Sequence, residues 1–193
     1  MKKLLVITIV TALVSSCGST KIKAEGIAAE KFKLCSDLKY DRLITVFYPN
    51  EGKLLIKKNI HSLFENSLLK QGYLTEISKT GYEDLLGKVK RGELDKKSTE
   101  QFRQELNFDP LLLFADSSFT SCYTMLIEEL KLMNDQGWHY QFRDAYWKFE
   151  ANGDLDSDSS NQIVKALQLI PVEKFEEIEY RKLFLDLIYM HLR

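Results

Sequence analysis

The sequence predicts a mainly α-helical fold, either a compact bundle of several helices or an irregular helical domain. Beyond residue 59, apolar residues recur every three or four positions, which is the spacing of one face of a helix. Capping residues and glycines separate these stretches. The composition, 45% apolar and 11% aromatic, supplies a packed core, and a formal net charge of −1 argues against a strongly basic nucleic-acid-binding protein.

The N-terminal part of the domain has weaker signals. Residues 28–38 fit one short helix. Residues 43–48 are rich in β-branched and aromatic side chains, and the turn-forming residues 49–52 separate them from a second apolar run at residues 53–56. Two such runs around a turn favour a small β-hairpin near the N-terminus.

Three short amphipathic helices are expected next, each with its own start or stop signal. The first begins near residue 60 and ends at Gly72, and the second ends at Gly92. Glycine readily takes the left-handed conformation that closes a helix. Capping boxes place the start of the second helix at Thr80 and the start of the third at Ser98.

The longest element is expected to be a single helix that opens at Asp109-Pro110 and ends at Gly137, since proline is favoured at the first helical position. Its polar residues Asp116, Ser117 and Ser118 fall on the solvated side. Its apolar residues step by three or four over about six turns. They are Leu112, Ala115, Phe119, Cys122, Leu126, Leu130 and Met133.

The C-terminal part is predicted to be helical as well. A helix at residues 138–150 and a helix capped by Ser159 form a hairpin around an acidic loop at residues 151–158. Pro171 opens the last helix. Its end, residues 183–192, is apolar around most of its circumference, so we expect it to be buried on more than one side.

The first residues have the layout of a secretory signal peptide. Lys2 and Lys3 precede an uncharged run at residues 4–14, and small residues follow. A helix of this length reaches roughly 16 Å, about half of a bilayer core of roughly 30 Å, so the run is too short for a stable membrane span. Residues 1–16 are therefore expected to be removed.

The end of this segment, Val14-Ser15-Ser16-Cys17, resembles the lipobox of bacterial lipoproteins, in which an aliphatic residue and two small residues precede a cysteine. The resemblance implies that Cys17 receives a diacylglyceryl thioether, that the preceding peptide is cut away and that the new amino group is acylated. Two or more acyl chains hold a protein stably on a membrane.

This resemblance also sets the expected domain boundaries and location. Residues 17–26 are the lipidated tether, and residues 27–193 are the helical domain. Gly18 stands where an aspartate would favour the inner membrane. In a Gram-negative host we therefore expect anchoring to the outer membrane, on its periplasmic face or at the cell surface.

With Cys17 lipidated, Cys35 and Cys122 remain, an even number in an oxidising compartment. One interpretation joins them in a disulfide that closes a long loop. The other makes them two small core residues that never meet, because cysteine is often buried. The sequence leaves both interpretations open.

The segment with most aromatic residues, 138–149, contains one surface candidate. Most of its rings share one helical face and are expected in the core. Tyr140 and Trp147 lie seven residues apart on another face, near Arg143 and Asp144. Such a pair stacks on a sugar ring or anchors a protein partner, unless a second helix covers it.

No cofactor or metal site is predicted. The acidic loop lacks the glycine and glutamate that a calcium-binding EF-hand needs, and a solvated turn explains it better. His61, His139 and His191 have no paired metal-ligand spacing. No nucleophile elbow surrounds Cys122, which lies on an apolar stripe.

These observations favour a non-catalytic lipoprotein of the cell envelope, held on the membrane by its lipid, that binds or adapts to another envelope protein. An immunity-type inhibitor is one variety of this role. The alternative is a lipoprotein that binds glycan or peptidoglycan through Tyr140 and Trp147. An envelope hydrolase that uses Cys122 or a histidine is the least favoured interpretation, and nucleic acid is not an expected partner.

Overall fold

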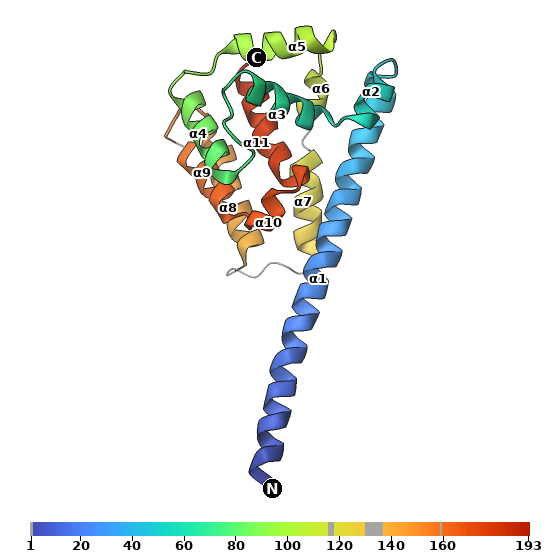
Figure 1. Cartoon of the computed structure of the whole chain (residues 1–193), viewed down its shortest axis with the longest axis vertical. Coiled ribbons are helices and arrows are strands. Elements are labelled where there is room, and N and C mark those ends of the chain that lie inside the picture. Colours follow the sequence, from blue (N-terminus) through green and yellow to red (C-terminus); the bar gives the residue numbers. More distant parts are fainter. Residues whose placement is uncertain (1, 116–117, 130–136, 159) are drawn as a thin grey trace.

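The computed structural model is mainly α-helical (Figure 1). It describes residues 2–115, 118–129, 137–158 and 160–193, with the backbone alone for residues 2–24 and for residues 118, 129 and 152, and these ranges contain no β-strand. The helices in chain order are α1 (Lys2–Phe47), α2 (Gly52–Lys57), α3 (Ile60–Lys70), α4 (Lys79–Lys90), α5 (Lys96–Leu106), α6 (Leu111–Phe114), α7 (Ser118–Glu129), α8 (Trp138–Asn152), α9 (Ser160–Leu169), α10 (Val172–Phe175) and α11 (Ile178–His191).

Helix α1 is much longer than the sequence predicts, and the β-hairpin prediction is wrong. The buried residues Phe32, Tyr40, Ile44 and Tyr48 continue one helical face at spacings of four and eight. Of residues 43–48, only Ile44 and Tyr48 are buried, and they are four positions apart as in a helix; α2 follows where a second strand was expected.

The segment predicted to be a tether also has a helical backbone. Residues 17–26 lie within α1, whose N-terminal part extends well away from the rest of the protein (Figure 1). Adding residues to an existing helix is inexpensive, and lysine, alanine and glutamate favour it. In the described part of the chain, no helix is long and apolar enough to span a membrane.

The long helix expected from Asp109 is divided. Helix α6 ends at Phe114, Ala115 is a bend, and α7 begins at Ser118. The bend lets Phe114 stack on Tyr189, with ring centroids 4.1 Å apart, while α7 packs along α1. Asp116, Ser117, Leu130 and Met133 lie outside the described residues, as does the side chain of Ser118.

The predicted stops of the short helices are confirmed, but their caps lie earlier than expected. Gly72 and Gly92 have left-handed φ angles of 77° and 67°. The side chain of Ser78, not of Thr80, accepts the N-terminal hydrogen bond of α4. Asp95 does the same for α5.

Ser98 does not cap α5, because it lies inside the helix and donates to the carbonyl oxygen of Asp95. The predicted cap at Ser159 lies outside the described residues. The last predicted helix is divided into α10 and α11, which Glu176 and Glu177 separate.

Helix α11 lies at the centre of the protein, as its apolar circumference predicts. Most of its residues are buried, and α3, α6 and α7 all contact it. Helices α8 and α9 pack against each other as the predicted hairpin, and α4 packs on α9. The buried apolar residues of α11 and its end are Tyr180, Leu183, Phe184, Leu185, Ile188, Tyr189 and Leu192.

Candidate binding site

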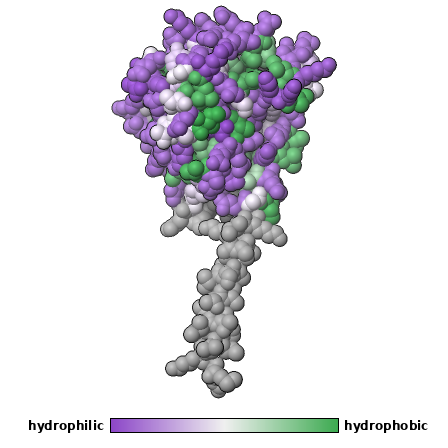
Figure 2. Space-filling model, in the orientation of Figure 1, coloured by the Kyte–Doolittle hydropathy of each residue, from purple (hydrophilic) through white to green (hydrophobic). Residues whose placement is uncertain are grey.

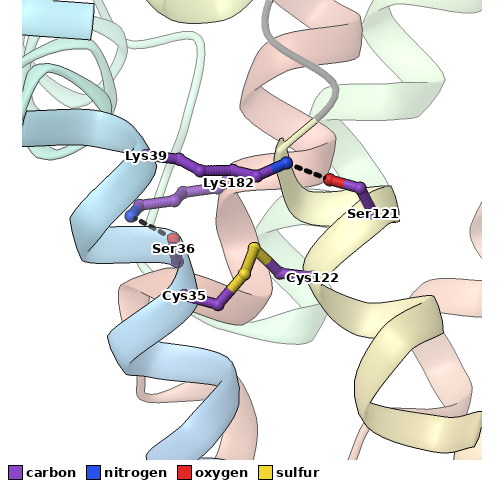
Figure 3. The surroundings of a disulfide bond; sticks show 6 residues. All are labelled: Cys35, Ser36, Lys39, Ser121, Cys122 and Lys182. Atoms are coloured by element: carbon purple, nitrogen blue, oxygen red, sulfur yellow. Dashed lines mark hydrogen bonds between the residues drawn. A yellow bond between two sulfur atoms is a disulfide. The ribbon is translucent and has the colours of Figure 1, made fainter. Parts of the chain in front are cut away.

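A disulfide between Cys35 and Cys122 joins α1 to α7, with the two Cα atoms 5.8 Å apart (Figure 3). Of the two interpretations that the sequence leaves open, the structure therefore has the bridge. Lys39 donates a hydrogen bond to Ser121 beside it. Because Cys122 is bonded and fully buried, it has no thiol to act as a nucleophile.

A buried lysine of α11 contacts the same part of α1. Lys182 of α11 donates a hydrogen bond of 2.9 Å to Ser36 of α1 (Figure 3). Its ammonium group lies 5.5 Å from the centre of the Tyr40 ring. Burial lowers the pKa of Lys182, and Glu179 opposes this shift. The contacts of Lys182 are internal, so we assign it to the packing of α1 and not to a ligand.

Another buried charged group joins α3, α4 and α11. The guanidinium of Arg181 donates to both carboxylate oxygens of Glu65, at 2.7 and 3.2 Å. The hydroxyl of Tyr82 donates to the same carboxylate at 2.5 Å. Arg181 also donates to two backbone carbonyls next to α10. Each member therefore has a partner, which is the condition under which a buried ion pair is tolerated.

The candidate site is a cavity of about 180 Å³ where α6, α7, α8 and α11 meet. Its apolar wall consists of Phe114, Ala115, Phe119, Leu183, Leu187 and Met190. Its polar wall consists of Thr120, Tyr146, Glu150 and Asp186. The cavity therefore combines an apolar lining with two carboxyl groups, from α8 and α11.

The polar groups of the cavity interact with one another. Burial raises the pKa of the Tyr146 hydroxyl; a hydrogen bond with Thr120 opposes the shift, and the carboxyl groups of Glu150 and Asp186 add to it. These two carboxyl groups are thus close enough to act on the same hydroxyl. A negative potential in a partly desolvated cavity favours a cationic group.

His61 contacts one of these two carboxyl groups, that of Asp186. Its Nε2 lies 2.7 Å from Oδ1 of Asp186, and its Nδ1 lies 3.1 Å from Oδ1 of Asn59, the N-cap of α3. Burial lowers the pKa of His61 well below its usual value, and the cation Lys182 lowers it further. With its proton on Nε2, the neutral ring donates to Asp186, and Nδ1 then has no hydrogen to donate to Oδ1 of Asn59, which accepts from the backbone N–H of His61 instead. His61 is only 3% exposed and does not line the cavity, so it is a positioning residue.

Tyr140 and Trp147, the aromatic pair proposed from the sequence, lie outside the cavity and contact Arg143. Tyr140 is half-buried, and Trp147 is 43% exposed. The guanidinium carbon of Arg143 lies 5.0 Å from the ring centre of Tyr140 and 4.4 Å from that of Trp147. Both rings therefore already stack with a cation of the protein itself, as cation–π geometry allows. Neither ring lines the cavity.

His139, the other histidine in the core, is also surrounded by groups of the protein itself. Nδ1 of His139 lies 2.6 Å from the hydroxyl of Tyr123, and its Nε2 lies 3.7 Å from Glu25 of α1. Trp138 donates to the same carboxylate at 2.9 Å. Glu25 thus links α1 to the start of α8. Among the residues whose placement is described, no group of three or more histidine, cysteine or acidic residues has the arrangement of a metal site.

Sequence reasoning missed the cavity altogether. Its lining comes from residues as far apart as Phe114 and Met190, and the helical period places the apolar members only in a core. The side chain of Cys17, the proposed lipid site, lies outside what the structure describes. Comparison with protein-family models, with curated proteins and with solved structures found no match to this chain.

Proposed function

We propose that this protein is a lipid-anchored protein of the cell envelope that binds another envelope protein by receiving one of its lysine side chains. The cavity between α7, α8 and α11 is the observation that carries the proposal. An immunity-type inhibitor that holds a partner in this way is one form of the role.

The size of the cavity favours a side chain over a free ligand. Pockets for drug-sized molecules and cofactors measure about 300–1,000 Å³. The cavity here, at about 180 Å³, is smaller than that range. A single side chain that enters from a partner surface fits this scale, as anchor residues do at protein interfaces.

The lining favours lysine in particular. A lysine side chain has a flexible aliphatic stem and a compact ammonium group. The stem would pack against Phe119, Leu187 and Met190, and the ammonium group would meet Glu150 and Asp186. An uncharged aliphatic side chain would leave both carboxyl groups without a new partner.

Two features support the envelope location. The lipobox-like residues end at Cys17, on the part of α1 that extends away from the body (Figure 1). A disulfide such as Cys35–Cys122 is typical of oxidising compartments. With the anchor at Cys17, the cavity would lie on the body, beyond the helical stalk.

The glycan alternative has less support. A sugar platform needs aromatic faces that are open to the ring of the sugar, and Arg143 already lies over both Tyr140 and Trp147. Binding to peptidoglycan through these residues would require Arg143 to move.

Methionine methyl NMR tests the cavity directly. The probe is Nα-acetyl-lysine methylamide, and its uncharged counterpart is Nα-acetyl-norleucine methylamide. We expect the lysine probe to shift the methyl signal of Met190, which lines the cavity, and to leave that of Met125, which is exposed on α7. Norleucine should have at most a tenth of the effect at equal concentration.

Variants separate the site from the surface. Glu150→Gln combined with Asp186→Asn should abolish the shift of Met190, while Glu128→Gln, an exposed carboxylate on α7, should leave it unchanged. In the envelope, a photo-crosslinking amino acid at Leu187 should yield an adduct with another protein, which the double variant loses. Equal shifts with both probes would contradict the proposal.

A further inference from the structure

Another pocket, of about 290 Å³, lies on the C-terminal part of α1. The described residues that line it have the spacing of one helix face: Lys39, Arg42, Leu43, Val46 and Phe47. We call these five residues the α1 pocket. Val46 and Phe47 are 58% and 53% exposed, so the pocket is open to solvent. Figure 2 shows hydrophobic residues on the side of the molecule where α1 and α2 lie.

The charged and the apolar residues of the α1 pocket are separated along the helix. The two cations, Lys39 and Arg42, come first, and the three apolar residues follow at positions 43–47. At about 1.5 Å per residue, Arg42 and Phe47 are roughly 7.5 Å apart along the axis. A pocket with a cationic end and an apolar end is complementary to a ligand that has an anionic head and an apolar tail.

The cations can both bind an incoming anion. Arg42 is exposed, and within the described part of the chain no group forms a hydrogen bond or an ion pair with its side chain. Lys39 donates one hydrogen bond to Ser121 of α7 (Figure 3). An ammonium group has three N–H donors, so this bond leaves others for a ligand.

The acidic residues nearest in the sequence do not cancel this charge inside the pocket. Asp37, Asp41 and Glu51 are not among its lining residues. At about 100° per residue, Asp41 projects roughly 160° away from Leu43, which places it on the other side of α1. The described lining of the pocket therefore carries positive charge alone.

The lining favours an acyl chain over a peptide as the apolar part of the ligand. None of the five side chains ends in an amide or a hydroxyl group, and the backbone N–H groups of this stretch are bonded within the helix. A peptide would have to keep its carbonyl groups turned to water, because a desolvated carbonyl without a donor is costly. An acyl chain has no polar group beyond its head.

We propose that the α1 pocket binds a free fatty acid. Arg42 and Lys39 hold the carboxylate, and the chain lies along Leu43, Val46 and Phe47. The planar fork of an arginine matches the two oxygens of a carboxylate. The volume is at the lower limit of the range for small-molecule pockets, about 300–1,000 Å³, and therefore suits one acyl chain.

Photolabelling tests the site in the intact protein. The full chain is produced in a Gram-negative host, and its membranes are irradiated with octanoate that carries a diazirine at the end of its chain. Mass spectrometry should locate adducts within residues 43–47. The corresponding octanamide, which has the same chain without the charge, should give at most a tenth of the labelling. Equal labelling by the two probes would overturn the proposal.

Variants test the role of the cations. Arg42→Gln should reduce labelling of residues 43–47 about fivefold, as expected for the loss of one exposed charge pair. Arg91→Gln, which removes an exposed arginine on another helix end, is the matched control and should leave labelling unchanged. Lys39→Glu/Arg42→Glu should lose the octanoate adducts and gain adducts with diazirine-bearing octylammonium. Undiminished labelling of Arg42→Gln would contradict the assignment.

Competition identifies the head and the tail of the ligand. Unlabelled octanoate should suppress the adducts, and hexanoate should need a roughly fivefold higher concentration, because the open pocket buries each methylene only in part. Octyl phosphate or an acetylated tripeptide that ends in leucine would overturn the proposal by competing better than octanoate. Neither outcome affects the lysine-probe result at Met190, so the two proposals fail separately.

Discussion

Loss of the Cys35–Cys122 disulfide should destabilise the protein by about 3–5 kcal/mol. The bond links residues 87 positions apart. For a loop of this length, the chain-entropy model gives a stabilisation of about 4.5 kcal/mol at 25 °C. Because Cys122 is fully buried, we choose the double variant Cys35→Ala/Cys122→Ala, which leaves no unpaired thiol in the core.

Urea unfolding at pH 7 measures the effect. With an m value of about 2 kcal/mol/M, the midpoint should fall by roughly 2 M. Dithiothreitol should lower the midpoint of the wild type by a similar amount and leave the double variant unchanged. A double variant with the wild-type midpoint, or a wild type that does not respond to the reductant, would refute the bond.

Three further predictions concern the core and the anchor. Burial lowers the pKa of His139 to about 4, so the unfolded state binds the additional proton, and this histidine should remove about 3 kcal/mol of stability as the pH drops from 7 to 4; His139→Gln should make the urea-derived profile shallower by that amount, and His61, whose pKa burial also lowers, should supply a remaining slope. Glu65→Leu should cost about 3–5 kcal/mol because it leaves Arg181 buried without its carboxylate, and Glu65→Leu/Arg181→Met should cost less, a ranking that thermal unfolding checks. Cys17→Ala should abolish incorporation of labelled palmitate into the chain in a Gram-negative host, and undiminished labelling would overturn the lipid site.

The parts of the fold that depend on neighbouring residues were predictable. The ends of α3 and α4 follow from the φ angles that Gly72 and Gly92 can adopt. The burial of α11 follows from its apolar circumference. These features do not depend on which residues pack against them, so a single sequence is enough to predict them.

The parts that depend on distant residues were not predictable. Residues 43–48 are too short to distinguish the period of a strand from that of a helix, and packing of α1 decides for the helix. The division between α6 and α7 is coupled to the stacking of Phe114 on Tyr189. Arg181 and Glu65 are 116 residues apart, so only the folded chain pairs them.

The helical conformation of α1 changes what can be expected of the segment at residues 17–26, which the sequence predicts to be a tether. A flexible tether would leave the orientation of the domain undetermined, whereas ten helical residues form a stalk about 15 Å long. The body end of this helix is fixed by the disulfide at Cys35, by Lys182 at Ser36 and by Glu25 at Trp138. Given an anchor at Cys17, a rigid stalk would restrict the orientation of the body relative to the membrane. The cavity would then be presented at a defined orientation, which favours binding to partners that are also held in the membrane.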